Sequence, residues 1–474
     1  MDRIGDKGNL TSGEGREMDL DRFHFLNKKK EPTGVFDNEI LEYFRENVQI
    51  LVIGRVPYIY HGGVFLPDLS EAETKSIIRG LIYPQFVKAP TLRRVYELII
   101  SAVEFQVTDD EMNLYPPEWI CFRNGFYDPI GRRMVPHDPK YRATNQIPHD
   151  FDPGKDASGR ELEKWFSFIF EEKDDREMFL RFAGYCMTRD TRQQKFMILC
   201  GEGGTGKSTL IRLLEDVVGS RNISSVSLSE LGQRFASYDL LGKLVNSCAD
   251  LEISALEDTS TLKKLLGEDN IKGEAKGKQP VFFKSYAKLL FSTNELPVVK
   301  TERTNGFYRR LLILNMNKIP AEKDPGFLEK LEKDLDYFIH ICVNALERMY
   351  EDGRLVESVS SVEAVRRLRC ESDTVEAFLN ETRCVVRGGL SDKARKSDLF
   401  RLYGVYCRVS DRQPLKKHAF FRALRAKGFQ EVKSEGVWHF RGIFYPENAS
   451  SWLKNNPETS FQELSREEMD DLPF

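Results

Sequence analysis

A glycine-rich loop between an apolar run and an amphipathic helix constrains this chain more than any other part of its sequence. Gly201, Gly206, Lys207 and Ser208 fall at the G-x-x-x-x-G-K-[ST] spacing, directly after the apolar residues 196–200. Strand, loop and helix in this order are the context in which the spacing indicates a phosphate-binding loop. A chance glycine-rich turn is the alternative, and the flanking strand and helix make it the weaker one.

The residue types of this loop suit a nucleoside triphosphate. Glycines let successive backbone N–H groups close around phosphate oxygens, and the following helix presents the positive end of its dipole to them. We expect Lys207 to reach the β and γ phosphates and Ser208 to hold Mg²⁺, which makes ATP and Mg²⁺ the expected cofactors. The expected nucleotide-binding residues are Gly201, Glu202, Gly203, Gly204, Thr205, Gly206, Lys207, Ser208 and Thr209.

A second strand is expected within residues 243–252, and it ends in two carboxylates. Metal-assisted phosphoryl transfer needs one carboxylate near Mg²⁺ and another group to orient the attacking water. Asp250 and Glu252 are two residues apart, so that they project to one face of an extended chain. We expect Asp250 to contact Mg²⁺ and one of the two acids to activate water. A pair of solvated loop acids is the alternative.

Two later segments supply further candidates for the same site. Residues 287–294 form an apolar run that ends in Asn294, whose side-chain amide can bind the γ phosphate or the attacking water. Residues 307–314 are expected to begin another strand, with Arg309 and Arg310 at its entrance. Either arginine can act as a finger that reaches the phosphates of a neighbouring subunit. Taken alone, the pair would be ordinary surface charge.

Residues 266–280 form a basic, glycine-rich turn between strand-like runs, which indicates a hairpin. Lys276 and Lys278 at its tip are candidates for contact with a nucleic-acid backbone. A solvated loop is equally compatible with these residues alone.

Composition excludes several classes of protein. A hydrophobic share of 41% and a charged share of 30% over 474 residues exclude a wholly disordered chain. No apolar run approaches the roughly 18 to 20 residues that cross a bilayer, and the N-terminus lacks the apolar segment of a signal peptide. We therefore expect a cytoplasmic protein with no membrane association. The eight cysteines include no C-x-x-C pair, which argues against structural zinc or a disulfide framework.

The net charge of −4 conceals a strong local asymmetry. Residues 393–441 hold thirteen Lys and Arg against four Asp and Glu, whereas residues 447–474 hold seven acids and two bases. Helices expected at 396–407 and 416–428, followed by a hairpin at 432–444, suggest a winged helix whose second helix enters the major groove. A protein-docking module is the alternative. The expected DNA contacts on the second helix are Lys416, Lys417, Arg422 and Arg425.

In this order, the motifs resemble those of superfamily 3 helicases of the phage and plasmid primase-helicase type, which are related to the poxvirus replicative ATPase. The resemblance covers roughly residues 120–445. It rests on residues 201–209 as Walker A, 249–252 as Walker B, 289–297 as motif C with Asn294 as sensor, and 306–310 as the arginine-finger segment.

The resemblance implies a hexameric, self-loading ring with an AAA+-like ATPase that pumps single-stranded DNA, commonly 3′→5′, in a phage or mobile genetic element. It implies that the loop with Lys276 and Lys278 is a pore hairpin. Implied partners are forked DNA, origin duplex DNA through the C-terminal domain, and a separate primase or polymerase. Only about 120 residues precede the resemblance, with one D-x-D match at residues 19–21, so we expect no primer synthesis. An initiator that melts DNA without processive unwinding and a monomeric P-loop kinase are the alternatives.

The expected fold class is α/β, an AAA+-like P-loop ATPase core with an N-terminal α+β domain and a C-terminal winged-helix domain. The expected boundaries are a disordered leader at 1–20, the N-terminal domain at 21–153, a helical collar at 154–192, the ATPase core at 193–355, the winged helix at 356–446 and an acidic tail at 447–474.

Overall fold

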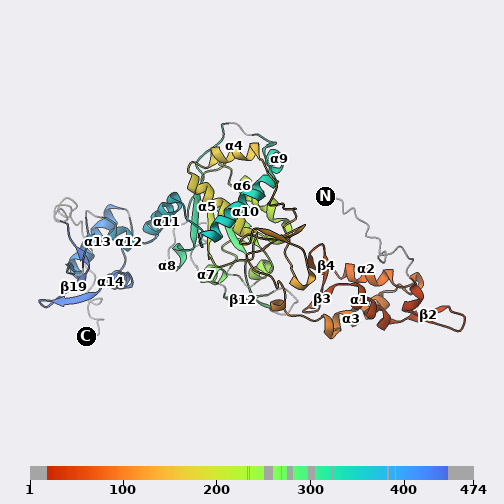
Figure 1. Ribbon diagram of the computed structural model, residues 1–474. Helices are drawn as coiled ribbons and strands as arrows, with labels where there is room; N and C mark the ends of the chain where they lie inside the picture. The colour runs from red at the N-terminus through yellow and green to blue at the C-terminus, as the bar shows by residue number, and fades with distance from the viewer. Residues whose placement is uncertain are drawn as a thin grey trace.

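The chain folds into an N-terminal module, a central α/β core and a C-terminal module, which lie in a row in Figure 1. The glycine-rich loop belongs to the core, so the core's sheet decides where the site lies. The computed structural model describes residues 19–231, 233, 235–249, 260–267, 269–274, 281–296, 305–321, 324–381, 384–389, 391–410 and 412–446.

A five-stranded parallel sheet forms the centre of the core, with strand order β10-β11-β14-β9-β15. Strands β9, β14 and β15 are almost wholly buried, as expected for apolar runs in a parallel sheet covered on both faces. Because β9 lies between β14 and β15, the loop that follows it leaves from the middle of the sheet. The strands are β9 (Phe196–Cys200), β10 (Ile223–Ser224), β11 (Val245–Cys248), β14 (Lys288–Thr293) and β15 (Leu311–Asn315).

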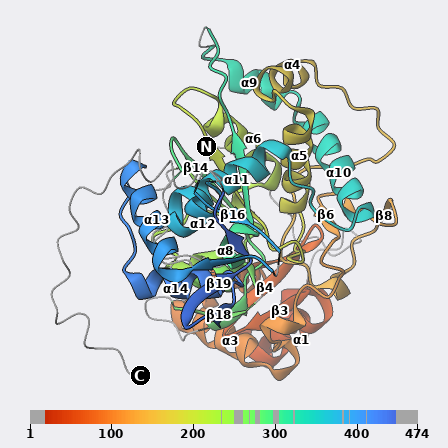
Figure 2. The same ribbon diagram turned by 90° about the vertical axis from the view of Figure 1, so that its left-hand side faces the viewer.

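Helices cover both faces of this sheet because alternate residues of each strand point to opposite sides. Met197 and Leu199 pack against one set of helices, of which α5, α6 and α10 lie together in Figure 2. Phe196 and Ile198 pack against the other set. The first set is α4 (Arg160–Ile169), α5 (Lys173–Cys186), α6 (Lys207–Val218), α9 (Phe327–Glu332) and α10 (Leu335–Glu351), and the second is α7 (Ser260–Leu266), α8 (Asn305–Tyr308) and α11 (Val359–Ser372).

Helix α11 covers the open edge of the sheet at β15. The backbone N–H of Ile313 donates to Ser361 Oγ at 2.9 Å, and Ala364 and Leu368 pack into the core. An edge strand with unpaired N–H groups would otherwise be open to another chain. We expected the C-terminal domain to begin at 356, but α11 packs with the core, so the C-terminal module begins after it.

The N-terminal module has its own hydrophobic core, within which Phe44, Val95 and Ile99 are buried. Strands β3, β4 and β5 form an antiparallel sheet beside the helices. The elements are β1 (His24–Leu26), β2 (Pro32–Val35), α1 (Asp37–Asn47), β3 (Ile50–Ile53), β4 (Val56–His61), β5 (Val64–Pro67), α2 (Ala72–Gly80) and α3 (Ala89–Ser101).

The next three strands, β6 (Ile120–Phe122), β7 (Gly125–Asp128) and β8 (Arg133–Val135), form a separate antiparallel sheet. Phe122, Tyr127 and Phe151 pack with the core, not with the N-terminal module. These aromatic contacts join residues 120–151 to the helices of the core sheet, whereas Phe126 packs with Val64 of β5, so the segment contacts both sides of the boundary expected at 153.

The C-terminal module is built around Phe378, Tyr403 and Phe420. Its hairpin of β18 and β19 turns at Glu435 and Gly436, where we expected it. The elements are α12 (Thr374–Leu379), β16 (Val386–Arg387), β17 (Lys393–Arg395), α13 (Lys396–Val409), α14 (Lys417–Ala426), β18 (Glu431–Ser434), β19 (Val437–Arg441) and β20 (Ile443–Phe444).

Phe307 and Tyr308 lie in the helical turn α8, so the last core strand begins at Leu311 and not at 307. Within the described part of the chain, no helix is long and apolar enough to cross a membrane.

Lys288, the first residue of β14, is an unusual lysine because it is only 2% exposed. Its Nζ donates to the carbonyl oxygens of Thr188 at 2.5 Å and Tyr286 at 3.2 Å. The ammonium also lies 4.6 Å from the centre of the Tyr185 ring. Burial lowers the pKa of Lys288 to about 7, since the charged form loses its hydration.

Because the pKa of Lys288 is lowered, we predict that the stability of the folded chain rises with pH above 7. In the unfolded chain the pKa of Lys288 is 10.5, so between pH 7 and 10.5 the folded state binds fewer protons than the unfolded state. Raising the pH from 7 to 9 should therefore stabilise the wild type by about 2 kcal/mol relative to Lys288→Met, measured by thermal unfolding. Lys284→Met, at an exposed position, should keep the wild-type pH dependence. Equal pH dependence in wild type and Lys288→Met would contradict the prediction.

Candidate functional site

The loop between β9 and α6 adopts a backbone that glycine tolerates best. Gly201, Gly204 and Gly206 have φ angles of 155°, 89° and 94°, which L side chains rarely adopt. A Cβ atom on Gly201 would lie 2.0 Å from the carbonyl oxygen of Met316, which follows β15. Glycine at 201 is therefore sterically required, and it lets the loop sit against the end of β15.

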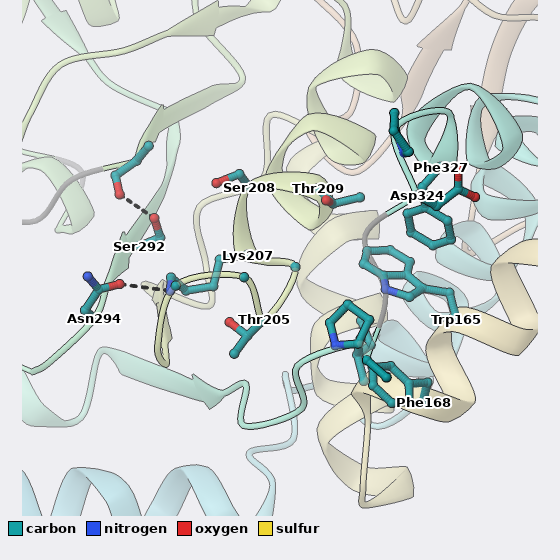
Figure 3. Close-up of a pocket in the computed structure, with 18 of the residues that line it drawn as sticks. Trp165, Phe168, Thr205, Lys207, Ser208, Thr209, Ser292, Asn294, Asp324 and Phe327 are labelled. Carbon is teal, nitrogen blue, oxygen red and sulfur yellow. Dashed lines mark hydrogen bonds between the residues drawn. The ribbon is translucent and has the colours of Figure 1, made fainter.

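Lys207, the first residue of α6, turns back into the loop and is largely buried. Its Nζ donates to the carbonyl oxygens of Gly201 and Glu202, the latter at 2.9 Å, and to Asn294 Oδ1 at 3.2 Å. Figure 3 shows Lys207 and Asn294 pointing toward one another. The parallel register of Thr293 with Cys200 explains the contact, because it brings the ends of β14 and β9 together. Two of the predicted site residues are therefore in direct contact.

The carboxyl end of β11 lies at the same edge of the sheet. Ser292 Oγ on β14 donates to the carbonyl oxygen of Ala249, the residue after β11. Ala249 and the exposed Ser208 line one cavity. Asp250 and Glu252 come next in the chain and lie outside the described residues. Ala249, the last described residue before these two acids, therefore lies beside the glycine-rich loop.

The cavity over the loop has a volume of about 1620 Å³. This exceeds the roughly 300 to 1,000 Å³ of ordinary small-molecule pockets, so a whole nucleoside triphosphate has room. Residues 203–209 form one wall, and the ends of β11 and β14 form a second. The third wall comes from α4 and from the segment that joins β15 to α9.

Aromatic residues of this third wall were not among the predicted site residues. We expected Trp165 and Phe168 to lie in a helical collar, but both line the cavity, as does Phe327 of α9. A signal was available in the sequence. The buried stripe of α4 runs through Leu162, Trp165 and Ile169, and Phe168 lies off this stripe, where a helix of a water-soluble protein usually carries polar residues.

Arg309 and Arg310, which the sequence left equivalent, differ in the structure. Arg310 is held by its own chain, because Nη1 donates to the Gly306 carbonyl oxygen at 2.7 Å and Nη2 donates to Gln194 Oε1 at 3.0 Å. Burial lowers the pKa of Arg310. The Arg309 side chain is exposed, while its backbone carbonyl accepts a hydrogen bond from Lys195 at 2.5 Å. Of the pair, Arg309 is the one available to another molecule.

The expected pore-hairpin lysines, Lys276 and Lys278, lie outside the described residues. They fall between β12 (Asn270–Gly273) and β13 (Val281–Lys284), which pair antiparallel. This pairing is consistent with a hairpin.

The expected DNA contacts of the C-terminal module are all exposed. Lys417, Arg422 and Arg425 lie on α14, and Lys416 immediately precedes it. Arg425 also lies 3.5 Å from Glu431 on β18, between Nη1 and Oε1. The helix therefore presents a basic surface whose last arginine is partly neutralised.

The sheet of β17, β19 and β18 carries a second basic surface that sequence reasoning did not single out. Lys393 lies opposite Arg441 and Arg395 opposite His439 across β17 and β19, and buried Ala394 points to the other face. Like charges directly across two strands destabilise a sheet. The charge count of residues 393–441 was a signal, but only the strand register places Lys393, Arg395 and Arg441 on one face.

Two family models match the chain. One, described as "D5 N terminal like", matches residues 68–171. The other, described as "Family of unknown function (DUF5906)", matches residues 199–310. The first match begins just after β5 and ends just past α4, so it crosses the boundary expected at 153.

A viral protein and three solved structures are similar to parts of the chain. "Putative helicase L207/L206" of Acanthamoeba polyphaga mimivirus is 28% identical over 205 residues, which cover 41% of this chain and 21% of that protein. The match thus spans about a fifth of the relative's length.

The A form apo structure of the NrS-1 C-terminal region (305–718) is 12% identical, covers 85% of this chain and 98% of that one, and has a TM-score of 0.51. Two further structures of this region have the same identity and coverage, with TM-scores of 0.49 and 0.46. The similarity to the structure with a TM-score of 0.51 concerns the fold alone. The D5 N-terminal match and the viral relative together support a D5-like primase-helicase relationship.

The loop geometry predicts different outcomes for glycine substitutions at two positions that are two residues apart. We expect Gly201→Ala to destabilise the core by about 2 kcal/mol or more, because its Cβ would overlap the Met316 carbonyl oxygen. Gly203→Ala should change stability by at most about 0.5 kcal/mol, because nothing lies within 4 Å of the added Cβ. Thermal unfolding without nucleotide measures both. Equal losses of stability would show that the loop does not pack against β15 as described.

Proposed function

We propose that this chain is an ATP-driven DNA helicase of replication, an AAA+ ATPase of superfamily 3 that forms a ring and translocates on single-stranded DNA. The observation that carries the proposal is the contact between Lys207 and Asn294 beside a glycine-rich loop on the central strand of a parallel sheet. The similarity to the mimivirus protein and the D5 N-terminal match support DNA as the substrate.

The residues of the loop fit ATP and Mg²⁺. The loop is open at Gly203 and Gly204, where an added Cβ would meet nothing closer than Ile319 Cγ2, 3.8 Å from the Gly204 position. Its backbone N–H groups and the N-terminus of the 12-residue helix α6 suit a chain of phosphates. In this proposal Lys207 exchanges the loop carbonyl oxygens for the β and γ phosphates.

The remaining groups complete the hydrolytic site at the edge of the sheet. Ser208 and Asp250 hold Mg²⁺, which neutralises charge on the β and γ phosphates. Asp250 or Glu252 orients the attacking water. Asn294 shares the Lys207 amine in the present structure, so that arrival of a γ phosphate at Lys207 changes the surroundings of Asn294 at once. This coupling suits a sensor of the bound nucleotide.

The neighbouring subunit of the ring supplies the arginine finger, and Arg309 is the better candidate. Arg310 makes two hydrogen bonds within its own chain, so its guanidinium is less available to a phosphate of another subunit. Arg309 is exposed beside it. The bonds of Arg310 then hold the segment from which Arg309 projects. A finger in trans would make hydrolysis depend on assembly of the ring.

DNA contacts complete the proposal. Lys276 and Lys278 face the central channel and follow single-stranded DNA, with 3′→5′ movement and self-loading at a fork. The C-terminal module acts as a winged helix that binds origin duplex through Lys416, Lys417, Arg422 and Arg425. The basic face around Lys393 and Arg441 enlarges this charged surface. A separate primase or polymerase of the phage or mobile genetic element is the expected protein partner.

Unwinding of a 3′-tailed duplex tests the proposed activity. The wild type should displace the strand with ATP, whereas Lys207→Ala should lose ATP hydrolysis and unwinding by about a hundredfold or more, because a phosphate-binding cation is lost. A duplex with a 5′ tail is the control for polarity. ATP hydrolysis without displacement on any tailed duplex would contradict the helicase and favour an initiator that melts DNA without processive unwinding.

Mixed rings test the shared site and separate the two arginines. Rings made only of Arg309→Ala subunits should lose most ATP hydrolysis, and mixing them with Lys207→Ala subunits should restore part of it, because some interfaces regain both halves. Arg310→Ala should instead lower the thermal midpoint, because Gly306 and Gln194 lose their partner. Failure of mixing to restore hydrolysis would argue against a site shared between subunits.

A further inference from the structure

The cavity over the glycine-rich loop has two chemically different ends. At one end lie Lys207 and Asn294, joined by their hydrogen bond. At the other end lie Trp165, Phe168 and Phe327, and Figure 3 shows these rings on the side of the loop away from Asn294. A cavity that served only phosphates and a metal ion would not need an aromatic wall, because apolar rings give no charge-assisted hydrogen bonds to an anion.

The direction of a bound triphosphate follows from the loop. In a loop of this type the lysine reaches the β and γ phosphates, while the preceding N–H groups hold the α and β phosphates. Since Lys207 and Asn294 mark the γ end, the α phosphate and the attached nucleoside point toward the opposite end of the cavity. Figure 3 shows Thr209 on the side of the loop toward Trp165 and Phe327, away from Asn294. The aromatic wall therefore lies where the base would be.

Trp165 of α4 is packed firmly against the edge of the glycine-rich loop. It is 8% exposed, and its ring meets that of Phe327 edge-on, with centroids 5.6 Å apart and planes at 74°. An added Cβ on Gly206 would lie 3.2 Å from Trp165 Cζ2. The absence of a side chain at Gly206 lets the indole approach the loop backbone, so the loop and the aromatic wall form one surface.

Phe168 supplies the open part of this surface. It is 41% exposed, whereas its neighbour Phe166 is fully buried. Exposure of a phenylalanine ring inside a cavity forgoes hydrophobic stabilisation unless a partner covers it. Polar groups rim the same end, where Lys330 Nζ pairs with Asp324 Oδ2 at 2.5 Å. An apolar wall with a few polar groups at its rim is the usual composition of a site for a planar organic ligand.

We propose that the wall of Trp165, Phe168 and Phe327 is a nucleobase subsite, in which a purine base stacks on the exposed Phe168 ring beside the Trp165 edge. The proposal rests on the proposed triphosphate site. A purine suits the subsite because two fused rings cover more of the wall than a single ring, and stacking on an aromatic side chain grows with the shared surface. The base, and not the triphosphate alone, then contributes to affinity and selects the nucleotide.

Calorimetric titration with two probes tests the subsite on the full chain. Magnesium ATP carries a base, and inorganic tripolyphosphate does not, so only ATP can respond to a change in the wall. Phe168→Ala should raise the Kd for ATP about tenfold, as for loss of one stacked base, and leave the Kd for tripolyphosphate unchanged. Phe168→Tyr keeps the ring and should keep wild-type affinity. CTP should lose less affinity than ATP in Phe168→Ala.

Phe25→Ala is the matched control, because Phe25 is 52% exposed in the N-terminal module, far along the chain from the cavity. It should bind both probes like the wild type. Equal weakening of ATP and tripolyphosphate by Phe168→Ala, or no effect on either, would overturn the nucleobase subsite while leaving the phosphate site in place. A wild type that binds neither probe, or a Lys207→Ala variant that binds both normally, would overturn the phosphate site itself and the subsite with it.

Discussion

The parallel pairing of β9 with β14 and β15 is the constraint on which the rest of the structure depends. It sets the carboxyl ends of three strands at one edge, so that the loop after β9, Asn294 after β14 and Met316 after β15 meet there. The register is fixed because both faces of the sheet are buried, and a shift by one residue would turn each strand's side chains to the wrong layer. The hydrogen bond from Lys207 to Asn294 is a consequence of this register.

The same packing explains why some groups can interact with another molecule and others cannot. Arg310 is fixed by hydrogen bonds to Gly306 and Gln194, and Lys288 is buried under the opposite end of β14. Arg309 and Phe168 are exposed, and they lie at the places where a second subunit and a nucleotide would arrive in the proposed mechanism. Arg310 and Lys288 are thus engaged within the fold, whereas Arg309 and Phe168 stay accessible to another molecule.

Much of the fold could be predicted from the sequence, because its signals are local. The G-x-x-x-x-G-K-[ST] spacing, the apolar runs at β9 and β14 and the turn at Glu435 and Gly436 each depend on a few adjacent residues. The boundaries near 153 and 356 depend on contacts between distant segments, which a local pattern does not show. Phe122 and Tyr127 attach residues 120–151 to the core by packing in its hydrophobic cluster, and Ser361 attaches α11 to β15 by a hydrogen bond. The aromatic end of the cavity was missed for the same reason, since Phe168 and Phe327 are far apart in sequence.

Helix α11 has a mechanical consequence. Its Ser361 binds β15, and at its far end Asp373 caps α12 and pairs with Lys427 Nζ at 2.7 Å. The C-terminal module is therefore joined to the edge of the sheet through helix α11 and through the ion pair of Asp373 with Lys427. A tilt of β15, which follows the segment of Arg309 and Arg310, would carry α11 with it and so move the basic surfaces of the C-terminal module.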